Sequence, residues 1–524
     1  MNVIRFAYTA TLLVLLIGGC GDDSGSPDDT REDGGNQPED ASMTDAAGDG
    51  DGDGDGDGGG DGDGDAGTLP IVTANDCPEP DGEGTTHDSD VDDETWTAED
   101  SPHKVTTSIT IKGTVTVEAC ATVVLAEGVS IYVGSSTDEG RLITQGTYVE
   151  GSSPTTEELR PVVFTSASEN EYWGMLFVNG LGEAEFNTTV LIRGGDAGAV
   201  STSNGGSLVA RGPNDGTLRR MVTANNLFIV DSGSFGVTLE SGAGFVEGAS
   251  SSLTVLNTGK LPKPAGYGAD FDPIYPVFVE PPGIGTLPPG IYDGTTDAER
   301  ADNDKILVVP SRAIAVDEQF NNYNTPYLIQ GPFYMQPATT TTATLTIEPG
   351  VELRFYRDPE GDTRYGMTIG DAPASTDPRL VTLDIAGSAN EPIVFTSDAD
   401  APAPGDWMGL YLDGSPASGN VLSHAVIEYA GGESGTNSYG CGPKDNDAAI
   451  LITDWRPDDA FITDVTIKDS AAGGIVCGWD SDEDGPDFTG NTFENIANDC
   501  EVARWQNMTG LACPDRTDEA PLCL

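Results

Sequence analysis

The chain has 524 residues and a formal net charge of −63, because 87 acidic side chains are set against only 24 basic ones. Such an acidic surface excludes nucleic acid and anionic lipid headgroups as favourable partners, and it leaves cations or a basic partner open.

The first 19 residues have the order of an export signal. Arg5 precedes the apolar run 10–17, and Gly18, Gly19 and Cys20 follow. This is the charge, core and small-residue order of a secretory signal, and the run is too short to remain as a membrane span.

Residues 17–20, Ile-Gly-Gly-Cys, resemble the bacterial lipobox. The resemblance implies cleavage before Cys20, diacylation of that residue, and a lipid anchor in a membrane. Gly21 at the next position implies sorting to the outer membrane of the cell envelope. Cys20 is therefore expected to be an anchor and not a redox or catalytic group.

Residues 20–70 are predicted to be a disordered tether. The stretch 21–70 contains 17 acidic side chains against Arg31 alone, with almost nothing that could enter a core. The Asp-Gly run 49–54 fits the start of a calcium loop by composition only, so a solvated linker is the preferred interpretation.

The rest of the chain contains an internal repeat with a period of very roughly 230 residues. Six landmarks return in the same order: 93–96 with 317–320, 101–105 with 325–329, 126–131 with 348–353, 142–147 with 383–388, 160–166 with 391–397, and 228–232 with 466–470. The pattern indicates a tandem duplication.

The apolar runs in each copy are short and rich in β-branched residues, as in 109–111 and 345–347, and Gly, Asn, Asp and Ser turns separate them. No long helical period is present, so an all-β chain is predicted. An antiparallel sandwich and a parallel solenoid both fit strands of this length, and the scarcity of hairpin turns favours the solenoid.

Three segments of the second copy, 345–351, 392–397 and 423–432, resemble the repeats of the right-handed parallel β-helix of the pectin-lyase-like fold. The resemblance covers about residues 93–500 and implies the fold more firmly than any activity.

The predicted organisation is a signal at 1–19, the lipidated Cys20 with its tether at 20–70, β-helix copy 1 at 71–260, a connecting segment at 261–316, copy 2 at 317–499 and a Cys-rich cap at 500–524. Whether the copies form one continuous solenoid or two packed ones is left open.

Seven cysteines remain after Cys20, an odd number in an oxidising compartment. Cys77 with Cys120 and Cys441 with Cys477 are the preferred disulfides, and Cys500, Cys513 and Cys523 are expected to staple the cap over the last coil. At least one thiol stays unpaired or pairs between chains.

Few residues form a motif typical of metal binding or catalysis. Asp480, Asp482 and Asp484 precede Gly485 at the alternate positions of a calcium loop, but Asn491 stands where the closing Glu belongs, so a solvated acidic loop is preferred to calcium. The pair Asp458-Asp459 is interpreted as a turn and not as catalytic carboxylates.

The three histidines, His87, His103 and His424, do not recur between the copies, and His87 is placed in an acidic loop. They therefore suggest no shared general base. The aromatic residues could form a sugar-stacking face, but core and turn anchors are the preferred interpretation; they are Tyr172, Trp173, Phe177, Trp407 and Tyr411.

The sequence favours a membrane-anchored surface lipoprotein that presents an acidic β-helix for binding or adhesion, with a carbohydrate or protein ligand. The alternatives are a polysaccharide lyase or hydrolase of the β-helix class and a structural protein of the cell envelope. A cluster of three carboxylates with Arg or Lys on one coil face would favour the enzyme.

Overall fold

The structure is a computed structural model. It describes residues 77–78, 82–149, 158–196, 205–213, 217–262, 275–294, 303–338, 341–357, 364–371, 379–416, 418–434, 447–453, 455, 457–479, 486, 488, 490–497 and 501–505. Cys20, the tether, Cys441, Cys500, Cys513, Cys523 and the three aspartates 480, 482 and 484 lie outside the described residues, so the predictions about them stay predictions.

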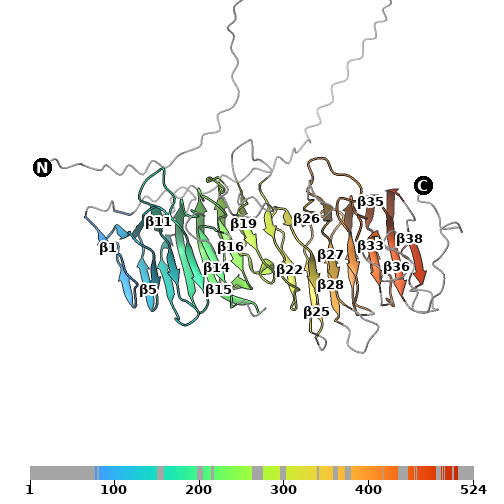
Figure 1. Ribbon diagram of the computed structural model, residues 1–524, viewed down its shortest axis with the longest axis horizontal. Coiled ribbons are helices and arrows are strands. Elements are labelled where there is room, and N and C mark those ends of the chain that lie inside the picture. Colours follow the sequence, from blue (N-terminus) through green and yellow to red (C-terminus); the bar gives the residue numbers. More distant parts are fainter. Residues whose placement is uncertain are drawn as a thin grey trace, which may run out of the picture. The chain divides into compact units, whose positions relative to one another are not determined.

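The described residues form parallel β-strands that stack in chain order, together with one antiparallel hairpin (Figure 1). No helix in the described part is long and apolar enough to cross a membrane. The all-β parallel β-helix expected from the sequence is confirmed.

One sheet runs through both copies and is called the long sheet here. Its 13 strands, in spatial order, are β37 (Thr492–Ile496), β35 (Thr466–Ser470), β32 (Ala425–Glu428), β29 (Ile393–Ser397), β26 (Glu352–Phe355), β23 (Tyr327–Ile329), β21 (Ile306–Val308), β19 (Val277–Val279), β16 (Val237–Glu240), β14 (Leu208–Arg211), β12 (Leu176–Asn179), β7 (Ile131–Val133) and β4 (Ile109–Ile111).

The first copy closes its coils with a 12-stranded sheet that has two branches. The first branch contains β1 (Thr85–His87), β3 (His103–Val105), β6 (Thr122–Leu125), β11 (Val162–Ser166), β13 (Glu183–Ile192), β15 (Arg219–Val230), β18 (Leu253–Leu256) and β20 (Gly290–Tyr292). The second branch joins the same β13 and β15 to β2 (Glu94–Trp96), β5 (Thr114–Glu118), β8 (Arg141–Gln145) and β17 (Ala243–Phe245).

The second copy closes its coils with two further sheets. The five-stranded sheet contains β22 (Glu318–Phe320), β25 (Ala343–Ile347), β28 (Val381–Ala386), β31 (Val421–Ser423) and β34 (Ile462–Thr463). The six-stranded sheet contains β24 (Phe333–Met335), β27 (Met367–Ile369), β30 (Leu410–Leu412), β33 (Ala448–Thr453), β36 (Gly473–Trp479) and β38 (Glu501–Trp505). The hairpin is β9 (Thr147–Val149) with β10 (Glu158–Arg160).

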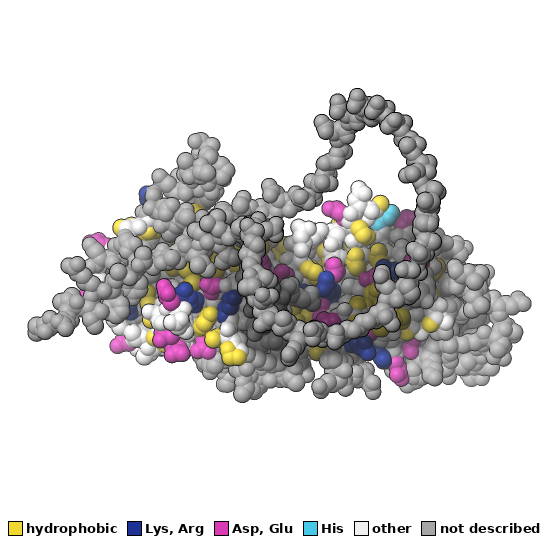
Figure 2. Space-filling model, turned by 90° about the horizontal axis from the view of Figure 1, so that it is seen from above, with side chains coloured by type: hydrophobic (Ala, Val, Ile, Leu, Met, Phe, Trp, Pro, Cys, Tyr) yellow, Lys and Arg dark blue, Asp and Glu magenta, His cyan; other side chains and the backbone are white. Residues whose placement is uncertain are grey.

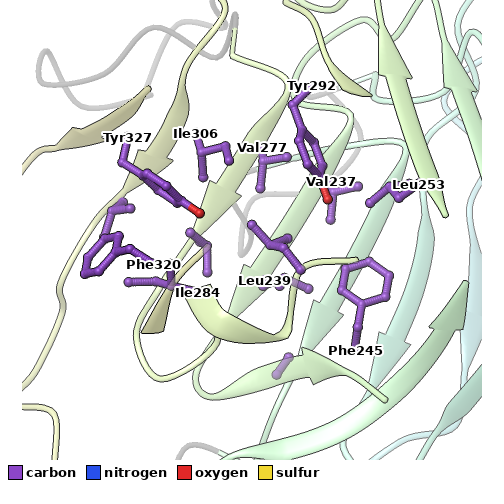
Figure 3. Packing of buried hydrophobic residues seen from close by; sticks show 14 of the residues in the cluster. Val237, Leu239, Phe245, Leu253, Val277, Ile284, Tyr292, Ile306, Phe320 and Tyr327 are labelled. Carbon is purple, nitrogen blue, oxygen red and sulfur yellow. The ribbon is translucent and has the colours of Figure 1, made fainter. Parts of the chain in front are cut away.

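The described parts of the segment 261–316 belong to the solenoid. It supplies β19, β20, β21 and a 3-10 turn, η3 (Ile284–Thr286), and β21 pairs with β23 of copy 2. Figure 3 shows its side chains Val277, Ile284 and Ile306 packed among those of both copies. The two copies therefore share one continuous hydrophobic core.

Several equivalent strands of the two copies lie in different sheets, although β7 and β26, which hold residues 131 and 353 of one repeated landmark, both lie in the long sheet. His103–Val105 (β3) belongs to the first branch, whereas its repeat Tyr327–Ile329 (β23) belongs to the long sheet. The same holds for β11 and its repeat β29. The chain therefore enters copy 2 with its pattern advanced by one face of the coil.

The corners of the coils repeat as well. Left-handed backbone occurs at Thr188 and Asn226 in copy 1 and at His424 and Asp464 in copy 2. Gly146 packs against the carbonyl of Thr188 and Gly387 against that of His424, where a Cβ atom would come within 2.1 and 2.3 Å. Glycine is required at both positions because the backbones approach too closely for any side chain.

Candidate functional site

A row of polar and charged side chains follows the outer face of the long sheet in copy 2. Strand pairing places Arg354 beside Thr396, Glu428 beside Lys468, and Lys468 beside Glu494. Neighbouring strands lie about 4.8 Å apart, so the row offers one polar group per coil at a regular spacing. Figure 2 shows acidic and basic side chains side by side among the described residues.

The first part of this charged row is a network of ion pairs. Lys305 Nζ lies 2.5 Å from Asp398 Oδ1, and the two side chains are only 4% and 11% exposed. Arg354 Nε lies 2.5 Å from Glu352 Oε1, and its Nη1 lies 3.9 Å from Asp398. Three strand or turn segments are thereby held together by opposite charges.

The second part of the row centres on Glu428. Lys468 Nζ lies 2.6 Å from its carboxylate, and the hydroxyl of Thr396 donates to it at 2.8 Å. The hydrogen bond that the ammonium of Lys468 donates to Glu428 raises the pKa of Lys468. The lysine is therefore held in its charged form.

A turn beside this row is fixed by Asp406, which is 2% exposed. Its Oδ2 accepts hydrogen bonds from the hydroxyl of Ser397 at 2.8 Å and from the backbone N–H of Ala403 at 2.9 Å, and its Oδ1 lies 2.8 Å from Arg357. Next to it, the ring of Trp407 stacks on Phe355 with centroids 4.0 Å apart. Both carboxylate oxygens of Asp406 are thereby engaged in holding the turn.

A polar hollow of about 230 Å³ opens at the start of the row, where the five-stranded sheet turns into the long sheet. Two successive coils line it, through Asn321, Asn322, Asn324, Thr325, Pro326, Gly350, Val351 and Glu352. Glu352 belongs to both the hollow and the charged row.

The hollow keeps its shape because part of its lining is tied to backbone. The amide of Asn322 donates to the carbonyl of Pro349 at 2.8 Å, and its oxygen accepts from the N–H of Asn324 at 3.0 Å. Asn321 donates to the carbonyl of Gly285 at 3.2 Å. The side chain of Asn324 is exposed, so its amide and the Glu352 carboxylate can meet a ligand.

Two further carboxylates lie near each other at the carboxyl ends of β16 and β19 in the long sheet. Glu240 is paired with Arg211 at 2.5 Å, and Glu280, the residue after β19, accepts from the N–H of Ser241 at 2.7 Å. Burial raises the pKa of Glu280. Glu240 is 4% exposed. Because general acid and base carboxylates must face each other across a substrate, this side-by-side pair is structural.

The structure places several sequence-predicted residues away from any site. Asn491 donates its amide to the carbonyls of Ile462 and Phe488 and accepts from Val465 N–H, so it is not free to bind a cation. Asp458 and Asp459 are exposed in a bend. Among the described residues no group of three potential metal ligands is present.

The aromatic residues are anchors of the core and of the turns. Trp173 and Trp407 are fully buried, and Phe177 and Tyr411 are 4% and 5% exposed, while Tyr172 is half-buried. The indole N–H groups of the two tryptophans donate to backbone carbonyls. They offer no stacking face to a sugar.

The histidines require a correction. His87 lies in strand β1 and is 6% exposed, not in an acidic loop, and it contacts the buried His103. His424 lies at a coil corner between β31 and β32. The spacing of sixteen residues between His87 and His103 does not predict their contact, because that contact depends on the length of the first coil.

Comparison with known proteins supports the fold. Residues 315–456 match the family model described as a pectate-lyase like beta helix domain. Together with the parallel sheets, this match supports a pectin-lyase-like β-helix. Searches of curated proteins and of solved structures gave no significant match.

Proposed function

We propose that this protein is a membrane-anchored surface lipoprotein that binds a neutral carbohydrate chain at the polar hollow and along the charged row, without catalysing a reaction. The observation that carries the proposal is the continuity of the hollow with the row through Glu352. The anchor rests on the lipobox resemblance at residues 17–20.

Carbohydrate suits the chemistry of this surface. Side-chain amides and carboxylates form hydrogen bonds with hydroxyl groups in both directions, and charged partners strengthen those bonds. The regular spacing of the row suits a polymer with a repeated unit. A neutral polymer is favoured over an anionic one because the chain carries a net charge of −63.

Absence of catalysis is favoured by the pairing of the basic groups. A lyase needs a base that is deprotonated and reaches the substrate. Lys305 is 4% exposed and held by Asp398, and Lys468 is held by Glu428. Both lysine side chains are therefore engaged by carboxylates.

The experiment is affinity electrophoresis of the full-length protein, extracted in detergent, through gels that contain a neutral glucan, galactan or mannan or the anionic polygalacturonate. Retardation by a neutral polymer is expected. Asn324→Ala and Glu352→Gln should each reduce it, whereas Asp384→Asn, an exposed acid on the five-stranded sheet, serves as the charge-matched control. Equal retardation of all variants would overturn the proposed site.

A polysaccharide lyase or hydrolase is the second candidate. Glu352, Asp398 and Glu428 pair with Arg354, Lys305 and Lys468 along the long sheet of copy 2. This is the cluster that would favour an enzyme. Release of new reducing ends or of unsaturated products from any polymer in the panel would establish it in place of simple binding.

A further inference from the structure

The first coil that the structure describes is filled by three neighbouring rings, of which two are imidazoles. His87, Trp96 and His103 come from β1, β2 and β3, with ring centroids 4.5 to 5.5 Å apart. The exposed fractions are 6% for His87, 0% for Trp96 and 2% for His103. These rings hold the first strands of the coil together.

The hydrogen bonds fix where protons can sit. His103 Nε2 lies 2.8 Å from the carbonyl oxygen of Thr97, which can only accept, so this nitrogen carries hydrogen. In a neutral ring Nδ1 of His103 then accepts, and at 3.1 Å its partner His87 Nε2 must donate. If both nitrogens of this contact carried hydrogen, two donors would face each other, so only one hydrogen lies between the two rings.

His87 has one remaining nitrogen, Nδ1, which lies 3.7 Å from the carboxylate of Glu94. With β1 and β2 in place, here called the closed coil, the pair can therefore take up one proton at most, since His87 Nδ1 is the one ring nitrogen left without hydrogen. Among the described residues the charged groups that act on His87 are Glu94 on β2, which favours its protonation, and His103 on β3, which opposes it. Burial is the largest of these effects and, together with His103, it outweighs Glu94 and lowers the pKa of His87.

The second copy fills the same place without titratable imidazoles. Its strands β21, β22 and β23 correspond to β1, β2 and β3, so that Val308, Phe320 and Tyr327 replace His87, Trp96 and His103. The hydroxyl of Tyr327 donates to the carbonyl of Asn321 at 2.7 Å, as His103 donates to that of Thr97. The histidines are thus not needed for the fold of a coil.

We propose that the His87–His103 pair makes the first coil an acid-sensitive switch, in which a fall in pH releases β1 and β2 from β3 and β5. The open coil binds two protons at its imidazoles, whereas the closed coil binds one at most. Acid therefore favours the open form by mass action.

The direction of the effect follows from the lowered pKa of His87 in the closed coil. The stability that the neutral pair contributes is present above the ordinary histidine value of about 6.5 and is lost as the pH falls through it. The Cys77–Cys120 disulfide ties the start of this coil to the turn between β5 and β6. Opening is thereby confined to the first coil.

The test is hydrogen exchange with mass-spectrometric detection on the full-length protein in detergent, corrected for the intrinsic pH dependence. From about pH 7.5 to about pH 5.5, the opening constant of residues 85–96 should rise about tenfold or more. Residues 381–397 in β28 and β29 should change less than about twofold on the same scale.

The decisive variant carries His87→Val and His103→Tyr, the arrangement of copy 2, and its opening constant should be nearly independent of pH. An equal rise in the wild type and this variant, or no rise in the wild type, would overturn the switch. If the double variant loses protection throughout, Glu94→Gln decides. Loss of that carboxylate should move the opening of the first coil to higher pH, and an unchanged midpoint would contradict the proposal.

Discussion

Glu94 and Glu318 occupy equivalent positions of the two copies but meet different surroundings. Glu94 is 39% exposed and lies 3.7 Å from His87. Glu318 is 4% exposed, and its Oε1 accepts from the N–H groups of Gly285 in η3 and of Gln319, both at 3.2 Å. Its Oε2 has no partner among the described residues. The difference arises because a coil precedes Glu318 and none is described before Glu94.

Burial raises the pKa of Glu318 to about 7. Since this folded-state pKa exceeds the unfolded value, the contribution of Glu318 to stability is present below about pH 4.5 and is lost as the pH rises through about 7. Glu318→Gln should remove this loss and stabilise the protein at pH 8 by up to about 3 kcal/mol relative to pH 4. Chemical unfolding at both pH values would measure it, and parallel pH profiles for variant and wild type would contradict it.

Removing the indole hydrogen bond of Trp173 or of Trp407 should lower the free energy of unfolding by about the same amount. Trp173 donates to the carbonyl of Ile192 at 2.7 Å, and Trp407 donates to that of Glu428 at 2.8 Å. Trp173→Phe and Trp407→Phe should each destabilise the protein by about 2 to 4 kcal/mol, from the buried unpaired carbonyl and the smaller ring. Denaturant unfolding would test this. A loss confined to one copy would show that the two turns are not equivalent.

The stability of the turn beside the charged row should depend on Asp406. Asp406→Ala removes the acceptor of Ser397, Ala403 and Arg357. The expected loss is about 2 to 3 kcal/mol, because hydrogen bonds to a buried charge are the strong ones. Asp384→Ala, on an exposed position, is the matched control and should stay within about 0.5 kcal/mol.

The anchor is tested by intact mass of the mature protein extracted from membranes. Acyl chains on Cys20 should appear in the wild type and vanish in Cys20→Ala, which should remain soluble after cell fractionation. An unlipidated, soluble wild type would show that the protein is secreted free.

The fold could be predicted from the sequence because the duplication places the same β-branched runs, Gly146 with Gly387 and Trp173 with Trp407, in one order. The shift by one face could not, since it depends on how β19, β20 and β21 of the connecting segment wind into coils. No sequence pattern indicates that winding.

The candidate site could not be predicted either. The hollow brings Asn324 beside Glu352 across two coils, and asparagine in turns is ordinarily structural. Lys305 meets Asp398 across 93 residues of chain. Such contacts are set by which coil stacks on which, and this information is not in the local pattern.

The most direct test of carbohydrate binding at the hollow is hydrogen exchange of the full-length protein. It is measured with and without the neutral polymer that slows the protein most in affinity electrophoresis. Carbohydrate binding at the hollow should give new protection at residues 321–326 and 350–354 and leave β5 and β8, in the second branch of the 12-stranded sheet, unchanged. Protection at β5 and β8 with none at the hollow would contradict it.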